Sequence, residues 1–167
     1  MVNNATQRRT GRHLAIMALA AFLAAAAGCD GMPMNGGMKM KTTVAHTDKT
    51  PKKVTDWGSL AWSVNSKAGN CETMTLGRVT IKAGKANPRH RHGNCDELLY
   101  LLSGELDHFA SDVGKLRMKP GDVIVIPIGV AHNARCVSTD DAEMIVIYSS
   151  ANREIEHVAQ ADDKAPK

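Results

Sequence analysis

The sequence predicts an all-β protein, a sandwich or barrel of short strands in one domain. Three observations lead to this prediction. Several runs of 4–10 residues are rich in Val, Ile, Leu and Thr, turn-forming Gly, Pro, Asn or Asp residues bound each run, and the 167 residues show no internal repeat. Short strands at regular spacing, separated by turn residues, are typical of β-sandwiches and barrels.

Four segments carry the strand prediction. Residues 73–82 alternate and contain several β-branched residues, while 98–102, 123–126 and 144–148 are short apolar runs. Because the last three runs are continuous rather than alternating, we expect their strands to be covered on both faces. The predicted barrel domain covers residues 57–150.

Composition and charge exclude several classes of protein. Hydrophobic residues make up 43% of the chain and aromatic residues 4%, which excludes a wholly disordered chain, a collagen-like repeat and a multi-span membrane protein. Three of the four net positive charges lie in residues 1–28, so the rest of the chain is nearly neutral. We therefore expect no nucleic-acid partner, because such proteins need a strongly basic face.

Residues 1–28 have the pattern of a signal peptide. A basic stretch with three arginines precedes 14 uninterrupted apolar residues, 14–27, whereas a membrane-spanning helix needs about 20. Residues 26–29 (Ala-Ala-Gly-Cys) then resemble a bacterial lipobox, in which the Cys is lipidated and becomes the mature N-terminus. The resemblance implies export to the periplasmic or cell-envelope face and a lipid anchor at Cys29.

Three alternatives for the N-terminus stay open. The chain has Ala26 where a lipobox prefers Leu, so an ordinary secretory signal cleaved near Gly28 is the second interpretation. Arg8-Arg9 resembles a twin-arginine export signal, but Thr10 and Gly11 follow where apolar residues are expected. The third is a buried core helix, which the lack of polar positions at helical spacing disfavours.

The predicted domain is flanked by two polar segments. Residues 29–56 are rich in Met, Gly and Lys without apolar periodicity, and predict a flexible tether. Two Met-x-Met pairs in this tether are soft ligands that suit Cu(I), but a solvated tether in which Met is incidental is the favoured interpretation. Residues 151–167 form a polar C-terminal tail, which we expect to fray or to form one helical turn.

Four residues form a candidate metal site: His90, His92, Glu97 and His132. Residues i and i+2 of a strand face the same side, so His90 and His92 project together. A four-residue connection, 93–96, is long enough to reverse the chain, so we expect Glu97 on the neighbouring strand, facing the same interior. Three imidazoles and one carboxylate suit one divalent transition metal ion, namely Mn, Fe, Co, Ni, Cu or Zn.

The residues around these four resemble the two sequence motifs of the cupin superfamily. The spacings are Gly84, five residues, His90-Arg91-His92, four residues, Glu97, six residues, Gly104; then Gly121, five residues, Pro127-Ile128-Gly129, two residues, His132. The resemblance implies a single jelly-roll barrel with His90, His92, Glu97 and His132 as metal ligands. It departs at Cys136, where the second motif usually ends in Asn.

The resemblance leaves two classes of function open. One is a metal-dependent enzyme of the cell envelope, dioxygenase-like or isomerase-like, that acts on a small oxygenated molecule; the four intact ligands favour it. The other is a non-catalytic metal- or small-molecule-binding or sensor module tethered to the membrane, which the short chain with few loops favours. A small molecule is the expected partner in both, and a homodimer stays open.

The remaining cysteines, histidines and acids have less specific signals. In an oxidising periplasm one disulfide is expected among Cys71, Cys95 and Cys136, with the pairing open. Cys136 shares strand parity with His132, so its sulfur is expected either to face the cavity or to form half of that bridge.

The other histidines are expected to be ordinary surface or core residues: His13, His46, His108 and His157. Three acids near the motifs are weaker acid–base candidates, with a solvated turn as the simpler explanation: Glu105, Asp107 and Asp122.

Overall fold

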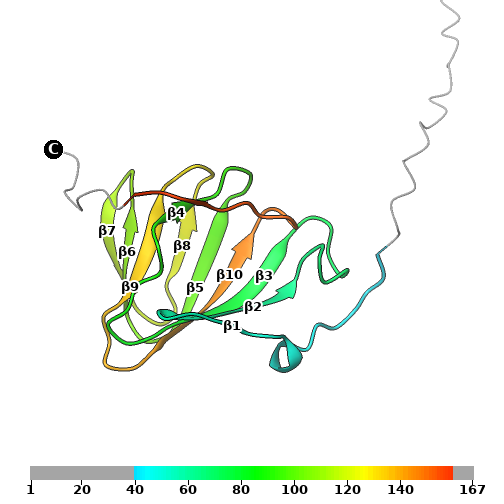
Figure 1. Cartoon of the computed structure of the whole chain (residues 1–167), viewed down its shortest axis with the longest axis horizontal. Coiled ribbons are helices and arrows are strands. Elements are labelled where there is room, and N and C mark those ends of the chain that lie inside the picture. The colour runs from blue at the N-terminus through cyan, green and yellow to red at the C-terminus, as the bar shows by residue number, and fades with distance from the viewer. Residues whose placement is uncertain (1–39, 160–167) are drawn as a thin grey trace, which may run out of the picture. The chain divides into compact units, whose positions relative to one another are not determined.

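The computed structural model describes residues 40–159, which form two antiparallel sheets (Figure 1). This confirms the all-β prediction. The residues of the predicted signal peptide and Cys29 lie outside the described residues. Within 40–159, no helix is long and apolar enough to cross a membrane. The elements are η1 (Thr47–Lys49), β1 (Lys53–Val54), β2 (Gly58–Val64), β3 (Thr75–Ile81), β4 (His90–Arg91), β5 (Glu97–Ser103), β6 (Leu106–Ala110), β7 (Gly114–Met118), β8 (Val123–Ile126), β9 (His132–Cys136), β10 (Ala142–Tyr148) and β11 (Glu156–His157).

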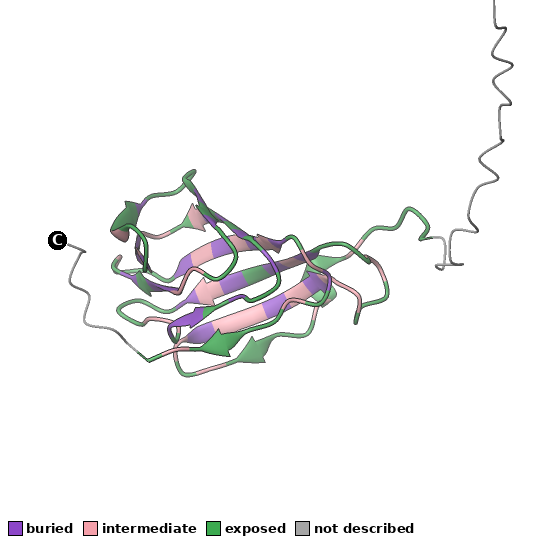
Figure 2. Cartoon of the chain, turned by 90° about the horizontal axis from the view of Figure 1, so that it is seen from above, coloured by how far each residue is buried: buried purple, intermediate pink, exposed green. Residues whose placement is uncertain are grey.

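The strand order is that of a barrel made of two facing sheets. One sheet has the order β1-β2-β3-β10-β5-β8 and the other the order β11-β4-β9-β6-β7. Strand β10 lies at the centre of the larger sheet, so that Met144 is opposite Val79 of β3 on one side and Leu101 of β5 on the other. These apolar side chains belong to one buried core contributed by both sheets. Figure 2 shows buried residues alternating with more exposed ones along the strands.

The expectation that the apolar strands are covered on both faces is wrong. Strands β5 and β8 alternate between buried and exposed residues. Leu98, Tyr100, Val123 and Val125 are 40%, 43%, 57% and 64% exposed. No other part of residues 40–159 covers the outer face of these two strands. Each continuous apolar run therefore contains side chains that face the core and, alternating with them, apolar side chains that are exposed.

Two segments outside the predicted barrel pack onto it. Within the predicted tether, β1 pairs with β2, and Lys53 lies opposite Leu60. Within the predicted tail, β11 pairs with β4, where Glu156 lies opposite Arg91. The expectation of a fraying tail or a helical turn is therefore wrong for residues 152–159. In Figure 1 this segment, drawn in red, crosses from the end of β10 towards β4.

Two glycines permit local packing that another residue would prevent. Gly77 of β3 lies opposite Trp62 of β2, and a Cβ at Gly77 would overlap the Trp62 ring. Gly104 turns the chain from β5 into β6 with a φ of +76°, in the left-handed region, and a Cβ there would lie 2.7 Å from the Cα of Ala142. Gly77 thus lets the indole of Trp62 lie flat against the sheet.

Candidate metal centre

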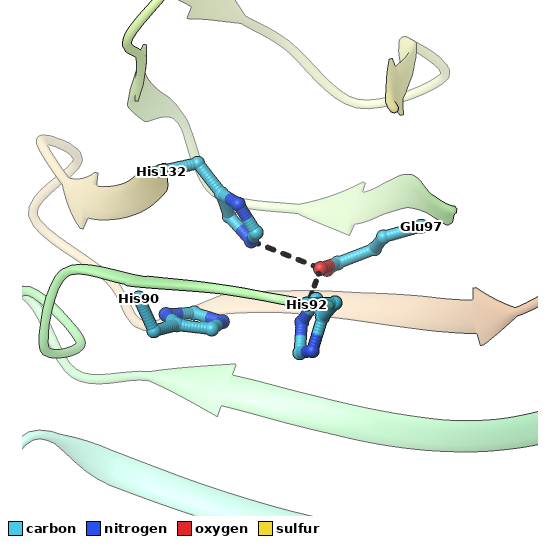
Figure 3. Close-up of side chains that lie close together, drawn as sticks. All are labelled: His90, His92, Glu97 and His132. Atoms are coloured by element: carbon cyan, nitrogen blue, oxygen red, sulfur yellow. Dashed lines mark hydrogen bonds and ion pairs between the residues drawn. The ribbon is translucent and has the colours of Figure 1, made fainter. Parts of the chain in front are cut away.

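The four predicted ligand residues lie together in the barrel interior, and all four are buried (Figure 3). His90 lies on β4 and His132 at the start of β9, directly opposite each other across a strand pair. His92 follows β4, and Glu97 is the first residue of β5. One ligand-type atom from each residue lies within 4.8 Å of the corresponding atoms of the other three.

The expectation that Glu97 lies on the strand next to the histidines is wrong. Strand β4 pairs with β9 and β11 in the smaller sheet, whereas β5 pairs with β10 and β8 in the larger one. The connection 93–96 therefore crosses from one sheet to the other. As a result Glu97 faces the three imidazoles across the barrel.

Backbone carbonyls fix the orientation of all three imidazoles. Nδ1 of His90 lies 2.8 Å from the carbonyl oxygen of Pro88, and Nδ1 of His132 lies 2.9 Å from that of Val130. Nδ1 of His92 donates to the carbonyl of Glu154. A carbonyl oxygen only accepts, so each Nδ1 carries the proton and each Nε2 is left to face the centre.

The carboxylate of Glu97 lies against two of these Nε2 atoms. Its Oε2 is 3.0 Å from Nε2 of His132 and 3.2 Å from Nε2 of His92. Burial alone raises the pKa of Glu97, but the contacts with His132 and His92 outweigh it and hold this pKa well below its usual range. Burial likewise lowers the pKa of His132, and Glu97 more than compensates, so that pKa is raised.

This arrangement fits a cation at the centre. With Nδ1 protonated, a neutral His132 has a lone pair on Nε2, which cannot donate to the carboxylate of Glu97. Either a proton on His132 or a metal ion must therefore compensate the buried negative charge. Nε2 of His92 is buried without a hydrogen-bond partner in the described structure. Separations of 3.0 and 3.2 Å match neighbouring ligands that each lie about 2.0–2.2 Å from one ion.

His90 is the fourth residue of the candidate centre, and its pKa is shifted in the opposite direction to that of His132. Burial, together with the smaller effect of the nearby His132, lowers the pKa of His90 to about 4. His90 is therefore neutral at pH 7, the state in which an imidazole can ligate a metal.

A cavity of about 300 Å³ opens onto these residues. His90, Glu97 and His132 contribute to its wall. Much of the remaining wall is apolar and comes from β2, β3, β5 and β10: Leu60, Val79, Ile81, Leu99, Met144 and Val146. The site thus combines converging polar groups with an apolar chamber, which is the usual construction of a small-molecule site.

Sequence reasoning did not place four notable polar or aromatic residues in the cavity wall: His108, Tyr148, Arg153 and His157. His108 was detectable, because it shares the core-facing parity of Leu106 and Ala110 on β6. Arg153 and His157 lie in the segment expected to fray, so no local pattern indicated their position.

The other named candidates lie away from the cavity. Arg117 pairs with both Glu105 and Asp107, and a carboxylate oxygen of Asp122 accepts a hydrogen bond from the backbone N–H of Lys119. The expectations of a disulfide and of a cavity-facing Cys136 are not met. Three cysteines of the described residues are free thiols, and the buried Cys136 contacts Ser138 and the carbonyl of Asp140 in the core.

The pattern of the cupin domain family matches residues 77–148. This part of the chain is similar to cupin domains. Among curated proteins, it is similar to germin-like protein subfamily 2 member 4 of Arabidopsis thaliana, at 31% identity over 86 residues, or 49% of this chain and 38% of that protein. Germin-like protein 3-8 of Oryza sativa is 31% identical over 98 residues, or 52% of this chain and 44% of its own length. The chain thus spans about two fifths of these relatives.

Solved structures share the fold of this domain. Lactobacillus farciminis oxalate decarboxylase superposes with a TM-score of 0.63 at 18% identity, covering 68% of this chain and 35% of that one. The polyketide cyclase RemF of Streptomyces resistomycificus gives 0.61 at 16%, covering 74% and 89%. KdgF of Halomonas sp. gives 0.57 at 19%, covering 66% and 96%.

Proposed function

We propose that this domain is a metal-dependent enzyme that acts on a small oxygenated molecule. The observation that carries the proposal is the convergence of three Nε2 atoms and one carboxylate on one side of a largely apolar cavity. Fold neighbours named as a decarboxylase, a cyclase and a sugar phosphate isomerase support an enzyme without selecting a reaction.

The residues of the chain define what the site can do. A divalent transition ion held by His90, His92, Glu97 and His132 would supply Lewis-acid polarisation of a carbonyl or enol oxygen, and a redox-active ion would also allow chemistry with O₂. Glu97 offsets part of the charge of the ion. The apolar wall excludes water, which strengthens electrostatic interactions inside the cavity. Dioxygenase-like and isomerase-like reactions are both consistent with this arrangement.

The deciding experiment combines metal analysis with activity. We expect protein purified from its native compartment to contain about one transition metal ion per chain. Oxygen uptake is then followed with diols, enols and thiols, and proton exchange at carbon is followed by NMR in D₂O. Turnover should be lost in Glu97→Gln and retained in His46→Ala, a control at an exposed histidine outside the cavity wall. Full metal occupancy without turnover on any of these substrates would favour the non-catalytic binding or sensor module.

We propose that the protein acts in the cell envelope, lipid-anchored through Cys29. The support is the sequence itself, in which three arginines, the apolar run 14–27 and residues Ala26–Cys29 follow in the order of a lipoprotein signal. The polar residues between Cys29 and the barrel then act as the spacer from the membrane.

We also propose that the domain forms a homodimer through the outer face of β5 and β8. Leu98 lies opposite Val125, and Tyr100 lies opposite Val123, so four exposed apolar side chains adjoin on one face. Strand β8 is at the edge of its sheet, with one side unpaired in the described structure. In a dimer with a twofold axis, these four apolar side chains of one copy would pack against the same four of the other. Such a contact is self-complementary and covers the apolar face of both copies.

A further inference from the structure

Arg153 lies at the cavity wall against two aromatic rings. Its guanidinium carbon is 4.2 Å from the centroid of the Trp62 ring and 4.9 Å from that of the Tyr148 ring. The two rings contact each other edge-on, with centroids 5.9 Å apart. A guanidinium stacked on ring faces is held in place by them, while the N–H groups at its edge stay able to donate.

The charge of Arg153 is not neutralised by an acid in the described part of the chain. Arg78, Arg91 and Arg117 each pair with a carboxylate, whereas Arg153 has no carboxylate within ion-pair distance among residues 40–159. Glu97 is the one acid in the cavity wall, and it is engaged by histidines. Lys53 also lines the cavity. The part of the cavity lined by Arg153 and Lys53 therefore favours an anion.

The backbone on either side of Arg153 is anchored to the loop that follows His92. The side-chain amide of Asn94 donates to the carbonyl of Asn152 at 2.8 Å and accepts from the N–H of Glu154 at 2.9 Å. The carbonyl of Glu154 in turn accepts from His92. Arg153 is thus fixed between two anchored residues, and the same hydrogen bonds connect it to a residue of the candidate metal centre.

The apolar part of the cavity wall favours a ligand with an apolar body. The aliphatic side chains of β2, β3, β5 and β10 form one side, and Trp57, Trp62 and Ile155 add to it. A ligand that consists only of carboxylates, such as oxalate, would leave this surface unburied. A ligand with both an acid group and an apolar body would use Arg153 and the wall together.

We infer that the cavity binds monocarboxylates with an apolar body, with the carboxylate on Arg153 and the opposite end directed towards the four-residue centre. That these monocarboxylates are also substrates rests on the proposed function. The binding site itself rests on Arg153 and its aromatic neighbours.

The test is a binding measurement on the whole protein that does not depend on turnover. Trp57 and Trp62 are the two tryptophans of the chain and both line the cavity, so intrinsic fluorescence reports its occupation. The probes are phenylacetate, 3-phenylpropanoate, 4-phenylbutanoate and oxalate, with the neutral amides of the three phenyl acids. We expect at least one phenyl acid to bind about tenfold or more tightly than its amide, because only the acid makes a charge-assisted contact. Oxalate should bind more weakly than that acid.

Two variants test whether Arg153 is the residue that contacts the carboxylate of the ligand. Arg153→Gln should abolish the preference for acid over amide, and Arg78→Gln, which removes a charge from the ion pair with Glu143 outside the cavity wall, should leave it unchanged. Both are measured in metal-loaded and chelator-treated protein. The inference is overturned if no phenyl acid binds, if acid and amide bind alike, if oxalate binds more tightly, or if the preference survives Arg153→Gln. Failure of the proposed function is seen separately, as absent metal or absent turnover.

Discussion

His108 lies flat against His132, with the ring centroids 5.6 Å apart and the ring planes inclined by 17°. The side chain of His108 is 1% exposed, and its Nδ1 has no hydrogen-bond partner in the described structure. Burial, together with the smaller effect of the nearby His132, lowers the pKa of His108 from 6.5 to about 4. His108 is therefore uncharged at pH 7 and packs against His132, one of the four residues of the candidate centre.

This burial predicts the direction in which pH changes the stability of metal-free protein. Below pH 6.5 the unfolded chain binds a proton at His108 that the folded chain excludes until about pH 4. The contribution of His108 to the free energy of unfolding therefore falls as the pH decreases through this window, by up to about 1.4 kcal/mol per pH unit. His108→Phe should flatten the pH dependence in urea unfolding between pH 7 and pH 4.5. An unchanged slope would mean that folding does not lower the pKa of His108.

Removing a residue of the centre should separate metal binding from folding. His92→Ala and His132→Ala are expected to lose most of the metal but to retain a cooperative thermal transition. The reason is that the apolar strands of the two sheets form the buried core, and apolar burial dominates the stabilisation. Metal content is measured by elemental analysis and unfolding by calorimetry, with His46→Ala as the matched control. If cooperative unfolding disappears with the metal, the ion has a structural role.

Protons and metal should compete at His132. Its pKa is raised by Glu97, so His132 still carries a proton at pH values where a free histidine has already lost it. Since a ligating imidazole must be unprotonated, apparent metal affinity should fall as the pH decreases, starting above pH 6.5 and by up to tenfold per pH unit for one displaced proton. Competition with a chromophoric chelator from pH 8 to pH 5 measures this. An affinity that stays constant down to pH 5 would contradict a ligand role for His132.

Local sequence was sufficient to place much of the fold. Strands β3, β5, β8 and β10 overlap the predicted segments, because runs of β-branched and apolar residues between turn signals specify strands without knowledge of their partners. The grouping of His90 with His92 followed from the two-residue period of a strand.

Positions that depend on distant partners could not be predicted in this way. The length of segment 93–96 shows that the chain turns before Glu97, but not that it crosses to the other sheet. The two residues of β11 pair with a two-residue β4, a contact too short to leave a periodic pattern. Arg153 is placed by rings from β2 and β10, and by the hydrogen bonds that its neighbours Asn152 and Glu154 make with Asn94. Its position therefore emerges only from the packed structure.

The exposed apolar face of β5 and β8 predicts self-association. Val125 is 64% exposed at the edge strand, so Val125→Lys would place a charge in the contact and should convert a dimer to a monomer. Val44→Lys is the matched control, because Val44 is 74% exposed and lies outside these strands. Sedimentation velocity at 1–100 μM distinguishes the two states, these concentrations being about the range of transient dimers. A monomeric parent protein over this range would exclude the proposed dimer.

Cys29 is expected to be the membrane anchor. Small residues precede it, the apolar run 14–27 leads to it, and residues 30–52 separate it from β1, which pairs with β2 of the barrel. A flexible coil spans about 5–6 Å × √n, so this spacer would let the barrel lie tens of ångströms from the bilayer. Cys29→Ser should move the protein from the membrane fraction to the soluble fraction, and Cys71→Ser should leave it at the membrane. Mass spectrometry of the parent protein should show a lipid-modified N-terminus at Cys29. If Cys29→Ser stays in the membrane fraction as fully as the parent, another part of the chain holds the protein at the membrane.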